Sequence, residues 1–195
     1  MSINLDKSSL RARLKSALIV LKGSGDFESK NKLLASNIGR LFNFHLKITH
    51  LNQYKIGAYA PMDLEPSWIS FLETEFGQKV TWSYPLLNSA GKMDFCISKY
   101  QELEKRRDFG VELLLPKLTM KSCSPDLLFI PGLGFTASGE RIGKGKGFYD
   151  KYLNGFEGVS VGLCFEEQIL MELPTEEHDK KMQFIVTDKR IIKCQ

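Results

Sequence analysis

The feature that most constrains the fold is one continuous apolar run, Asp126-Leu-Leu-Phe-Ile130, which is ended by Pro131-Gly132. Every side chain after the aspartate is apolar. This is typical of a strand that is covered on both faces, as the inner strands of parallel sheets are. We therefore predict an α/β fold with a mainly parallel sheet.

Helical and strand patterns alternate along the chain, with no linker, repeat or low-complexity segment. We therefore predict one domain over residues 1–195, built as a three-layer α/β sandwich. Its helices are expected at residues 10–21, with Asn4 or Asp6 as the N-terminal cap, and at 29–42, 68–76 and 101–108; the first two should pair against a sheet. Its strands are expected at 54–60, 80–84, 93–97, 126–130, 159–165 and 184–187.

Composition excludes several classes of protein. The 27 basic and 23 acidic residues leave a net charge of +4, which is too small to indicate nucleic-acid binding. The four cysteines form no Cys-x-x-Cys pair, so we expect reduced thiols. The apolar run at residues 17–21 is far shorter than the roughly 20 residues that cross a bilayer. We expect a cytoplasmic protein without a signal peptide or a membrane partner.

Glycine and basic residues alternate between Gly139 and Asp150, after the apolar strand. Glycine allows backbone N–H groups to approach an anion closely, while Arg141, Lys144 and Lys146 supply positive charge. A helix beginning near Phe148 would add its positive end. The segment therefore predicts a phosphate-binding loop, although a mobile surface loop with solvated lysines has the same composition.

The segment of residues 132–150 differs to different degrees from two common nucleotide-binding motifs. It is not a Walker A loop, because the spacing from Gly139 to Lys144 is one residue short and no Ser or Thr follows the lysine. Residues 132–137 match G-x-G-x-x-A, with Asp150 as a possible ribose acceptor. A dinucleotide-dependent oxidoreductase thus stays an alternative, and it requires a helix that begins at Gly134.

The run LLFIPGLGFTASGERIGKGKGFYDKYL, residues 127–153, closely resembles the signature of 5-formyltetrahydrofolate cyclo-ligases. Further matching pieces lie in the same order, at residues 7–11, 59–65 and 173–179. The resemblance implies an ATP- and Mg²⁺-dependent enzyme that closes 5-formyltetrahydrofolate to 5,10-methenyltetrahydrofolate with release of ADP and phosphate. It also implies small-molecule partners, a reduced folate and ATP, and we expect a monomer.

The resemblance assigns an ATP site to the first helix and the glycine-rich loop. Lys7 and Arg11 are one helical turn apart, so both can point at one phosphate. The remaining ATP-binding residues are Arg141, Ile142, Gly143, Lys144, Gly145, Lys146, Gly147, Phe148 and Tyr149. Of these, Arg141, Lys144, Lys146, Phe148 and Tyr149 are implied to act in catalysis.

The folate and metal sites are also assigned by the resemblance. Glu65 and Ala60 match folate contacts, Met93 and Phe95 are candidate walls for the pterin, and Lys144 to Phe148 complete the substrate set. Asp150 and Asp179 match the magnesium ligands, and carboxylate oxygens suit Mg²⁺ when phosphates and waters complete its octahedron.

Four positions differ from the family pattern: Leu86, Thr136, Phe148 and Gln183. Phe148 lacks a hydroxyl and Leu86 lacks a charge that could meet the substrate, so either change could alter folate affinity. A second hypothesis follows, in which the chain binds folate or ATP without turnover.

Overall fold

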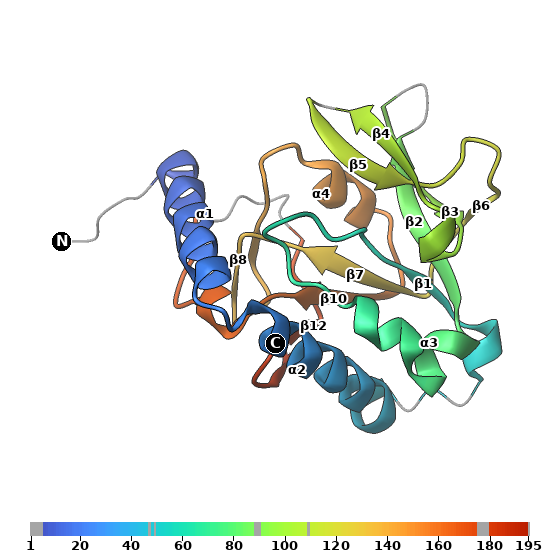
Figure 1. Cartoon of the computed structure of the whole chain (residues 1–195), viewed down its shortest axis with the longest axis horizontal. Helices are drawn as coiled ribbons and strands as arrows, with labels where there is room; N and C mark the ends of the chain where they lie inside the picture. Colours follow the sequence, from blue (N-terminus) through green and yellow to red (C-terminus); the bar gives the residue numbers. More distant parts are fainter. Residues whose placement is uncertain are drawn as a thin grey trace.

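The computed structural model describes residues 6–46, 48, 50–87, 91–108, 110–174 and 180–194. Its largest element is an eight-stranded sheet in the order β13-β12-β10-β7-β1-β2-β3-β6 (Figure 1). The strands are β1 (Lys55–Gly57), β2 (Thr81–Leu87), β3 (Met93–Ile97), β6 (Ser122–Cys123), β7 (Leu127–Pro131), β10 (Val159–Leu163), β12 (Phe184–Val186) and β13 (Ile191–Lys193). Pairing is parallel from β12 through to β2, and β13, β3 and β6 are antiparallel. The prediction of a mainly parallel sheet is confirmed.

Strand β7 is the apolar run from which the fold was predicted. Leu127 and Phe129 pack into one core cluster, and Leu128 and Ile130 pack into the other. All four side chains are fully buried. Because successive side chains of a strand point to opposite faces, both faces of the sheet must be covered here.

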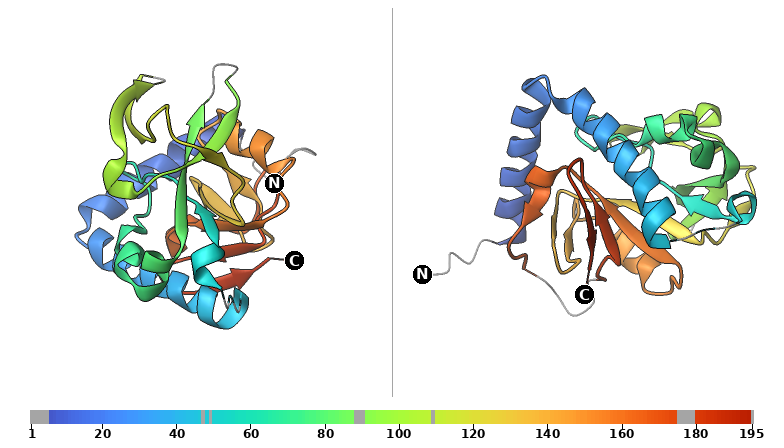
Figure 2. Two further views of the ribbon diagram at one scale, coloured as in Figure 1. Left: turned by 90° about the vertical axis from the view of Figure 1, so that its right-hand side faces the viewer. Right: turned by 90° about the horizontal axis from the view of Figure 1, so that it is seen from below.

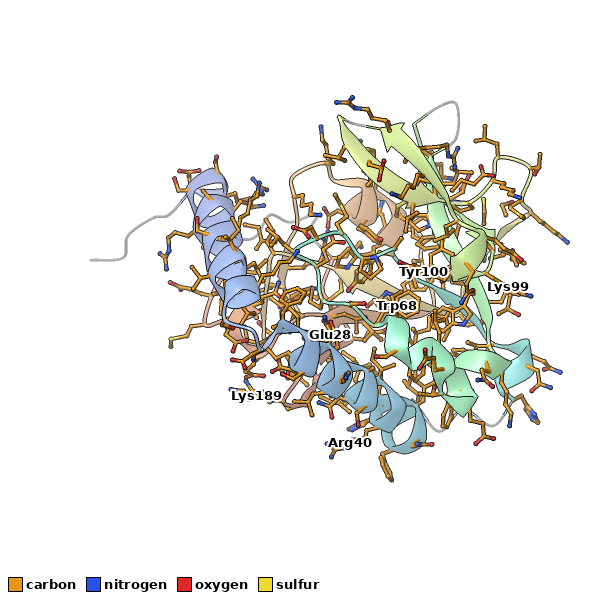
Figure 3. The ribbon with its side chains drawn as sticks, viewed as in Figure 1. Glu28, Arg40, Trp68, Lys99, Tyr100 and Lys189 are labelled. Atoms are coloured by element: carbon orange, nitrogen blue, oxygen red, sulfur yellow. The ribbon has the colours of Figure 1, made fainter. Side chains whose placement is uncertain are left out.

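Helices cover one face of the sheet. They are α2 (Phe27–Arg40), the π-helical turn η1 (Leu41–Leu46), the 3-10 turns η2 (Leu51–Gln53) and η3 (Ile69–Glu73), and α3 (Glu75–Lys79). Trp68 lies fully buried between these helices and the sheet, where its ring stacks on Trp82 with centroids 4.7 Å apart (Figure 3). Such aromatic packing excludes water from this layer.

The other face carries α4 (Phe148–Leu153) and a small sheet of β11 (Ile169–Leu170), β8 (Gly134–Thr136) and β9 (Arg141–Ile142) (Figure 2). The turn η5 (Glu166–Gln168) leads into β11. Leu153 and Phe135 bury their side chains against the residues that β7 presents to this face. The prediction of a three-layer α/β arrangement is therefore confirmed.

Helix α1 (Lys7–Gly23) packs on the small sheet and not on the main sheet. Its buried residues Leu10 and Leu14 pack against Ile142 of the small sheet and against Leu173. Figure 1 accordingly shows α1 beside β8, apart from the central strands. Its N-terminal cap is Asp6, whose carboxylate accepts from the amide of Ser8 at 2.7 Å.

The helix predicted at residues 101–108 is wrong. Only a 3-10 turn, η4 (Tyr100–Glu102), is helical, and an antiparallel hairpin of β4 (Glu104–Asp108) and β5 (Val111–Leu115) follows it. Gly110 lies in the turn with φ of +79°, a conformation that favours glycine. The run of charged residues at 104–108 has no helical periodicity, so its pairing with β5 decided its structure.

The helix predicted at residues 68–76 is divided into two elements, η3 and α3.

All four cysteines are free thiols, as predicted. Burial raises the pKa of Cys164 well above its ordinary value. Within the described ranges, no helix is both long and apolar enough to span a bilayer.

Candidate active site

The glycine-rich segment is carried to the carboxyl edge of the main sheet by the hairpin that follows β7. Strand β8 turns back from the end of β7, and Gly139 at the far turn accepts from the Met182 amide at 2.7 Å. Strand β9 then returns, and the Leu133 amide donates to the Ile142 carbonyl at 2.8 Å. The loop of residues 143–147 therefore lies where parallel sheets bind ligands.

Two glycines of this loop have backbone conformations that other residues rarely adopt. Gly145 has φ of +91° and Gly147 has φ of +68°. Gly147 is the N-cap of α4, so the helix begins at Phe148 as predicted. These glycines allow the chain to turn sharply between β9 and α4.

Arg11 reaches the loop from α1. Its Nε donates to the Gly143 carbonyl at 2.9 Å, and its guanidinium carbon is 3.5 Å from the position that a Cβ would take on Gly145. Lys7 lies one turn earlier on the same helix. The structure therefore brings the first helix and the glycine-rich loop together, in agreement with the sequence interpretation.

Lys144 and Glu65 join the two parts of the site that the resemblance assigned to ATP and to folate. The Lys144 Nζ and Glu65 Oε1 are 2.6 Å apart, and only 11% of the Glu65 side chain is exposed. The second carboxylate oxygen accepts from the Met62 amide at 2.9 Å, while the Met62 sulfur lies 3.1 Å from Nζ. Charge-assisted contacts of this kind hold the loop after β1 against the glycine-rich loop.

Ala60 lines a cavity of about 270 Å³ next to this contact. The remaining lining comes from Pro61, Met62 and Asp63 of the same loop and from residues 112–114 of β5. Neither Met62 nor the β5 residues were expected at the site. Their contribution depends on a hairpin that the sequence pattern did not predict.

Arg141 lies beneath the loop, and only 6% of its side chain is exposed. It donates to the Pro131 carbonyl at 3.2 Å and to Asp150 at 2.6 Å, and its guanidinium is 5.7 Å from the centre of the Tyr149 ring. Its position supports the loop from below, whereas Lys144 and Lys146 are exposed on it. Burial and the charge of Glu65 raise the pKa of Tyr149, which keeps this phenol protonated.

Met93 and Phe95 are core residues. Their side chains are 6% and 1% exposed, and the Phe95 ring packs against Tyr152 with centroids 5.0 Å apart. In this structure they offer almost no surface to a pterin, because α4 covers that face of the sheet. Asp179 lies outside the described residues.

The departures from the family pattern fall in different environments. The Thr136 hydroxyl donates to Glu140 at 2.8 Å inside the β8–β9 turn, and the Gln183 side chain accepts from the Ser160 amide at 2.9 Å at the opposite edge of the sheet. Leu86 is half-buried on β2, and Phe148 is half-buried at the start of α4. Only Phe148 adjoins the loop.

The oxidoreductase alternative is wrong. A dinucleotide site requires a helix directly behind residues 132–137, where the pyrophosphate meets the helix N-terminus. Residues Gly134–Thr136 instead form β8.

The chain is similar to known proteins of one family. The model of the 5-formyltetrahydrofolate cyclo-ligase family matches residues 3–188. The 5-formyltetrahydrofolate cyclo-ligase of Mycolicibacterium smegmatis is 30% identical over 143 residues, which cover 68% of this chain and 73% of that protein. That of Haemophilus influenzae is 31% identical over 64% of this chain and 70% of its own length. The mouse protein of the same name is 42% identical, but the match spans 31% of this chain and only 33% of that protein.

Two solved structures share the fold. The 5,10-methenyltetrahydrofolate synthetase of Aquifex aeolicus superposes with a TM-score of 0.75 and 21% identity, covering 97% of this chain and 93% of that chain. That of Mycoplasma pneumoniae has a TM-score of 0.70 and 19% identity, covering 94% and 99%. Since the family model matches almost from end to end and the fold agrees, the chain belongs to the 5-formyltetrahydrofolate cyclo-ligase family of ligases.

Proposed function

We propose that this protein uses Mg-ATP to close 5-formyltetrahydrofolate to 5,10-methenyltetrahydrofolate, with ADP and phosphate as the other products. Family membership supports the reaction. The observation that carries the assignment of residues is the 2.6 Å contact between Lys144 and Glu65. It brings the loop assigned to the nucleotide next to the loop assigned to the folate, as transfer of a phosphoryl group between the two substrates requires.

The nucleotide would lie on the glycine-rich loop. The amides of residues 143–147 and the side chains of Lys7, Arg11 and Lys146 are the groups proposed to meet the triphosphate. Glycine amides and basic side chains are suited to phosphate oxygens. Lys144 would lie between the phosphates and the folate, since it already contacts Glu65.

The reaction needs two nucleophilic steps. The formyl oxygen on N5 attacks the γ-phosphorus, and ADP departs. The N10 lone pair then attacks the activated formyl carbon, phosphate leaves with the electron pair of the C–O bond, and N10 gives up its proton. Phosphoryl transfer requires little covalent chemistry from the protein. Positioning and charge neutralisation by Lys144, Lys146 and Arg11 would therefore account for most of the rate enhancement.

Asp150 and Asp179 are proposed to hold Mg²⁺. Asp150 is a hard oxygen donor, it adjoins the glycine-rich loop, and 26% of its side chain is exposed. This donor fits a magnesium ion whose other ligands are phosphates and waters. Mg²⁺ would neutralise charge on the phosphates, and the protein would fix the position of Asp150 through Arg141.

The direct test is to mix the protein with 5-formyltetrahydrofolate and Mg-ATP and to follow the ultraviolet absorbance of 5,10-methenyltetrahydrofolate. Lys146→Ala and Asp150→Ala should remove most of the product. Lys151→Ala is the matched control, because this exposed lysine lies on α4 outside the glycine-rich loop and should leave the rate unchanged. Binding of either substrate without product in the wild type would instead indicate a relative that binds without turnover.

A further inference from the structure

Gln168 lies buried beside the turn that follows β7, at the end of η5. Its side chain is 2% exposed. The amide Nε2 donates to the carbonyls of Gly132 at 2.9 Å and Leu133 at 3.1 Å. The amide oxygen accepts from the Phe165 N–H at 2.8 Å. Both polar atoms of the amide therefore form hydrogen bonds, and the two carbonyls that accept from it lie 36 and 35 residues away along the chain.

The two carbonyls belong to the turn that leads from β7 to β8. The preceding carbonyl, that of Pro131, accepts from Arg141. Three successive carbonyls, from the last residue of β7 into the turn, are thus held by side chains. An unpaired buried carbonyl costs about 1–3 kcal/mol, so the conformation of the turn depends on these donors.

The turn is connected to the glycine-rich loop by a short series of contacts. The Leu133 amide donates to the Ile142 carbonyl at 2.8 Å, and Ile142 directly precedes Gly143. The Gly143 carbonyl accepts from Arg11 at 2.9 Å. Strand β11, which begins right after Gln168, pairs with β8. A shift of the turn would therefore move β9 and the amides that follow it.

We propose that Gln168 is a positioning residue for the nucleotide: its amide fixes the turn after β7 so that the amides of residues 143–147 face the triphosphate. This inference rests on the proposed function, because it takes the glycine-rich loop as the ATP site. Gln168 itself lies below the loop and does not touch the substrates. Misplacement of a binding group by a fraction of an ångström weakens a site that depends on its geometry.

The test replaces the amide without changing the length of the side chain. Gln168→Met removes all three hydrogen bonds, and Gln168→Glu keeps the acceptor for the Phe165 amide but replaces the two N–H donors with a carboxyl group that can donate at most one hydrogen bond. Asn37→Ala is the matched control, because the buried Asn37 amide donates to the Thr187 carbonyl at 2.9 Å, away from the glycine-rich loop. The dissociation constant of a non-hydrolysable Mg-ATP analogue is measured by calorimetry, together with the melting temperature and the KM for 5-formyltetrahydrofolate.

Both Gln168 variants should raise the dissociation constant of the analogue by about tenfold, while they change the KM for 5-formyltetrahydrofolate by less than about twofold. Asn37→Ala should lower the melting temperature and leave the affinity for the analogue unchanged. A merely structural Gln168 would behave like Asn37, and wild-type affinity in either folded Gln168 variant overturns the inference. If Gln168→Met does not fold, Gln168→Glu decides the question. Failure of the wild type to bind the analogue would instead refute the proposed ATP site.

Discussion

The Arg141 guanidinium and the Asp150 carboxylate lie 2.6 Å apart beneath the glycine-rich loop. The resemblance assigned these residues to different ligands, the phosphates and Mg²⁺, yet the structure pairs them with each other. Because Arg141 is almost fully buried and Asp150 is partly exposed, the arginine orients the carboxylate toward the site. The role that follows for Arg141 is support of Asp150, the proposed metal ligand.

Arg141→Lys is expected to disturb the proposed metal site while retaining a positive charge. A lysine cannot contact the Pro131 carbonyl and Asp150 with the fixed geometry of a guanidinium, so the carboxylate loses its orientation. We expect activity to fall by about tenfold or more and half-maximal activity to require more Mg²⁺. The measurement is the initial rate of methenyl formation over a series of Mg²⁺ concentrations. Arg190→Lys, which alters an arginine paired with Glu166 at 2.7 Å, should leave this dependence unchanged; a wild-type Mg²⁺ dependence in Arg141→Lys would contradict the role.

The contact between Lys144 and Glu65 predicts that their effects on turnover are not independent. Glu65→Gln and Lys144→Met should each lower kcat/KM, and the loss in the double variant should be smaller than the product of the single losses by about threefold or more. Steady-state kinetics of all four proteins gives the comparison. The exposed pair of Lys79 and Glu75, 2.5 Å apart on α3, serves as control, and its removal should not alter the rate. Strictly multiplicative losses at positions 65 and 144 would show that the contact is absent in the working enzyme.

Gly147 and Gly155 provide a comparison of two glycines near the ends of α4. No atom lies within 4 Å of a Cβ added at either position, but Gly147 has φ of +68°. Gly147→Ala should therefore reduce the free energy of unfolding by about 1–2 kcal/mol, and Gly147→Asn by less. Gly155→Ala should cost little. Urea unfolding monitored by tryptophan fluorescence measures these differences, and equal losses for the two alanine variants would refute the conformational explanation.

Two buried tyrosines differ in whether the hydroxyl has a partner. The Tyr59 hydroxyl donates to the Pro66 carbonyl at 2.7 Å, whereas the Tyr84 hydroxyl is buried without a hydrogen bond among the described residues. Tyr59→Phe should cost about 1–2 kcal/mol of unfolding free energy, because it leaves the carbonyl unpaired. Tyr84→Phe should be neutral or stabilising. Denaturant unfolding measures the free energy of unfolding of both variants. A larger loss of this free energy for Tyr84→Phe than for Tyr59→Phe would contradict the hydrogen-bond assignment.

Local patterns in the sequence predicted the frame of the molecule. The uninterrupted apolar residues of β7 required two covered faces, which implies a parallel sheet between two layers. The glycines and lysines between Gly143 and Gly147 indicated an anion loop, and the resemblance indicated its chemistry. These features were accessible because side-chain periodicity and glycine conformation act over a few neighbouring residues.

Tertiary structure decided what depends on contacts between distant residues. The apolar stripe of α1 would suit any apolar surface, and only the packing directs it to the small sheet. From the sequence, Phe95 could be a pterin wall, although a residue of this kind on a strand is more often core, and the cover provided by α4 makes it core. No periodic pattern in the sequence indicates the ion pair of Lys144 with Glu65 or the hydrogen bonds of Gln168 to the turn after β7. They follow from strand order and register, which place residues far apart in the chain within hydrogen-bond distance.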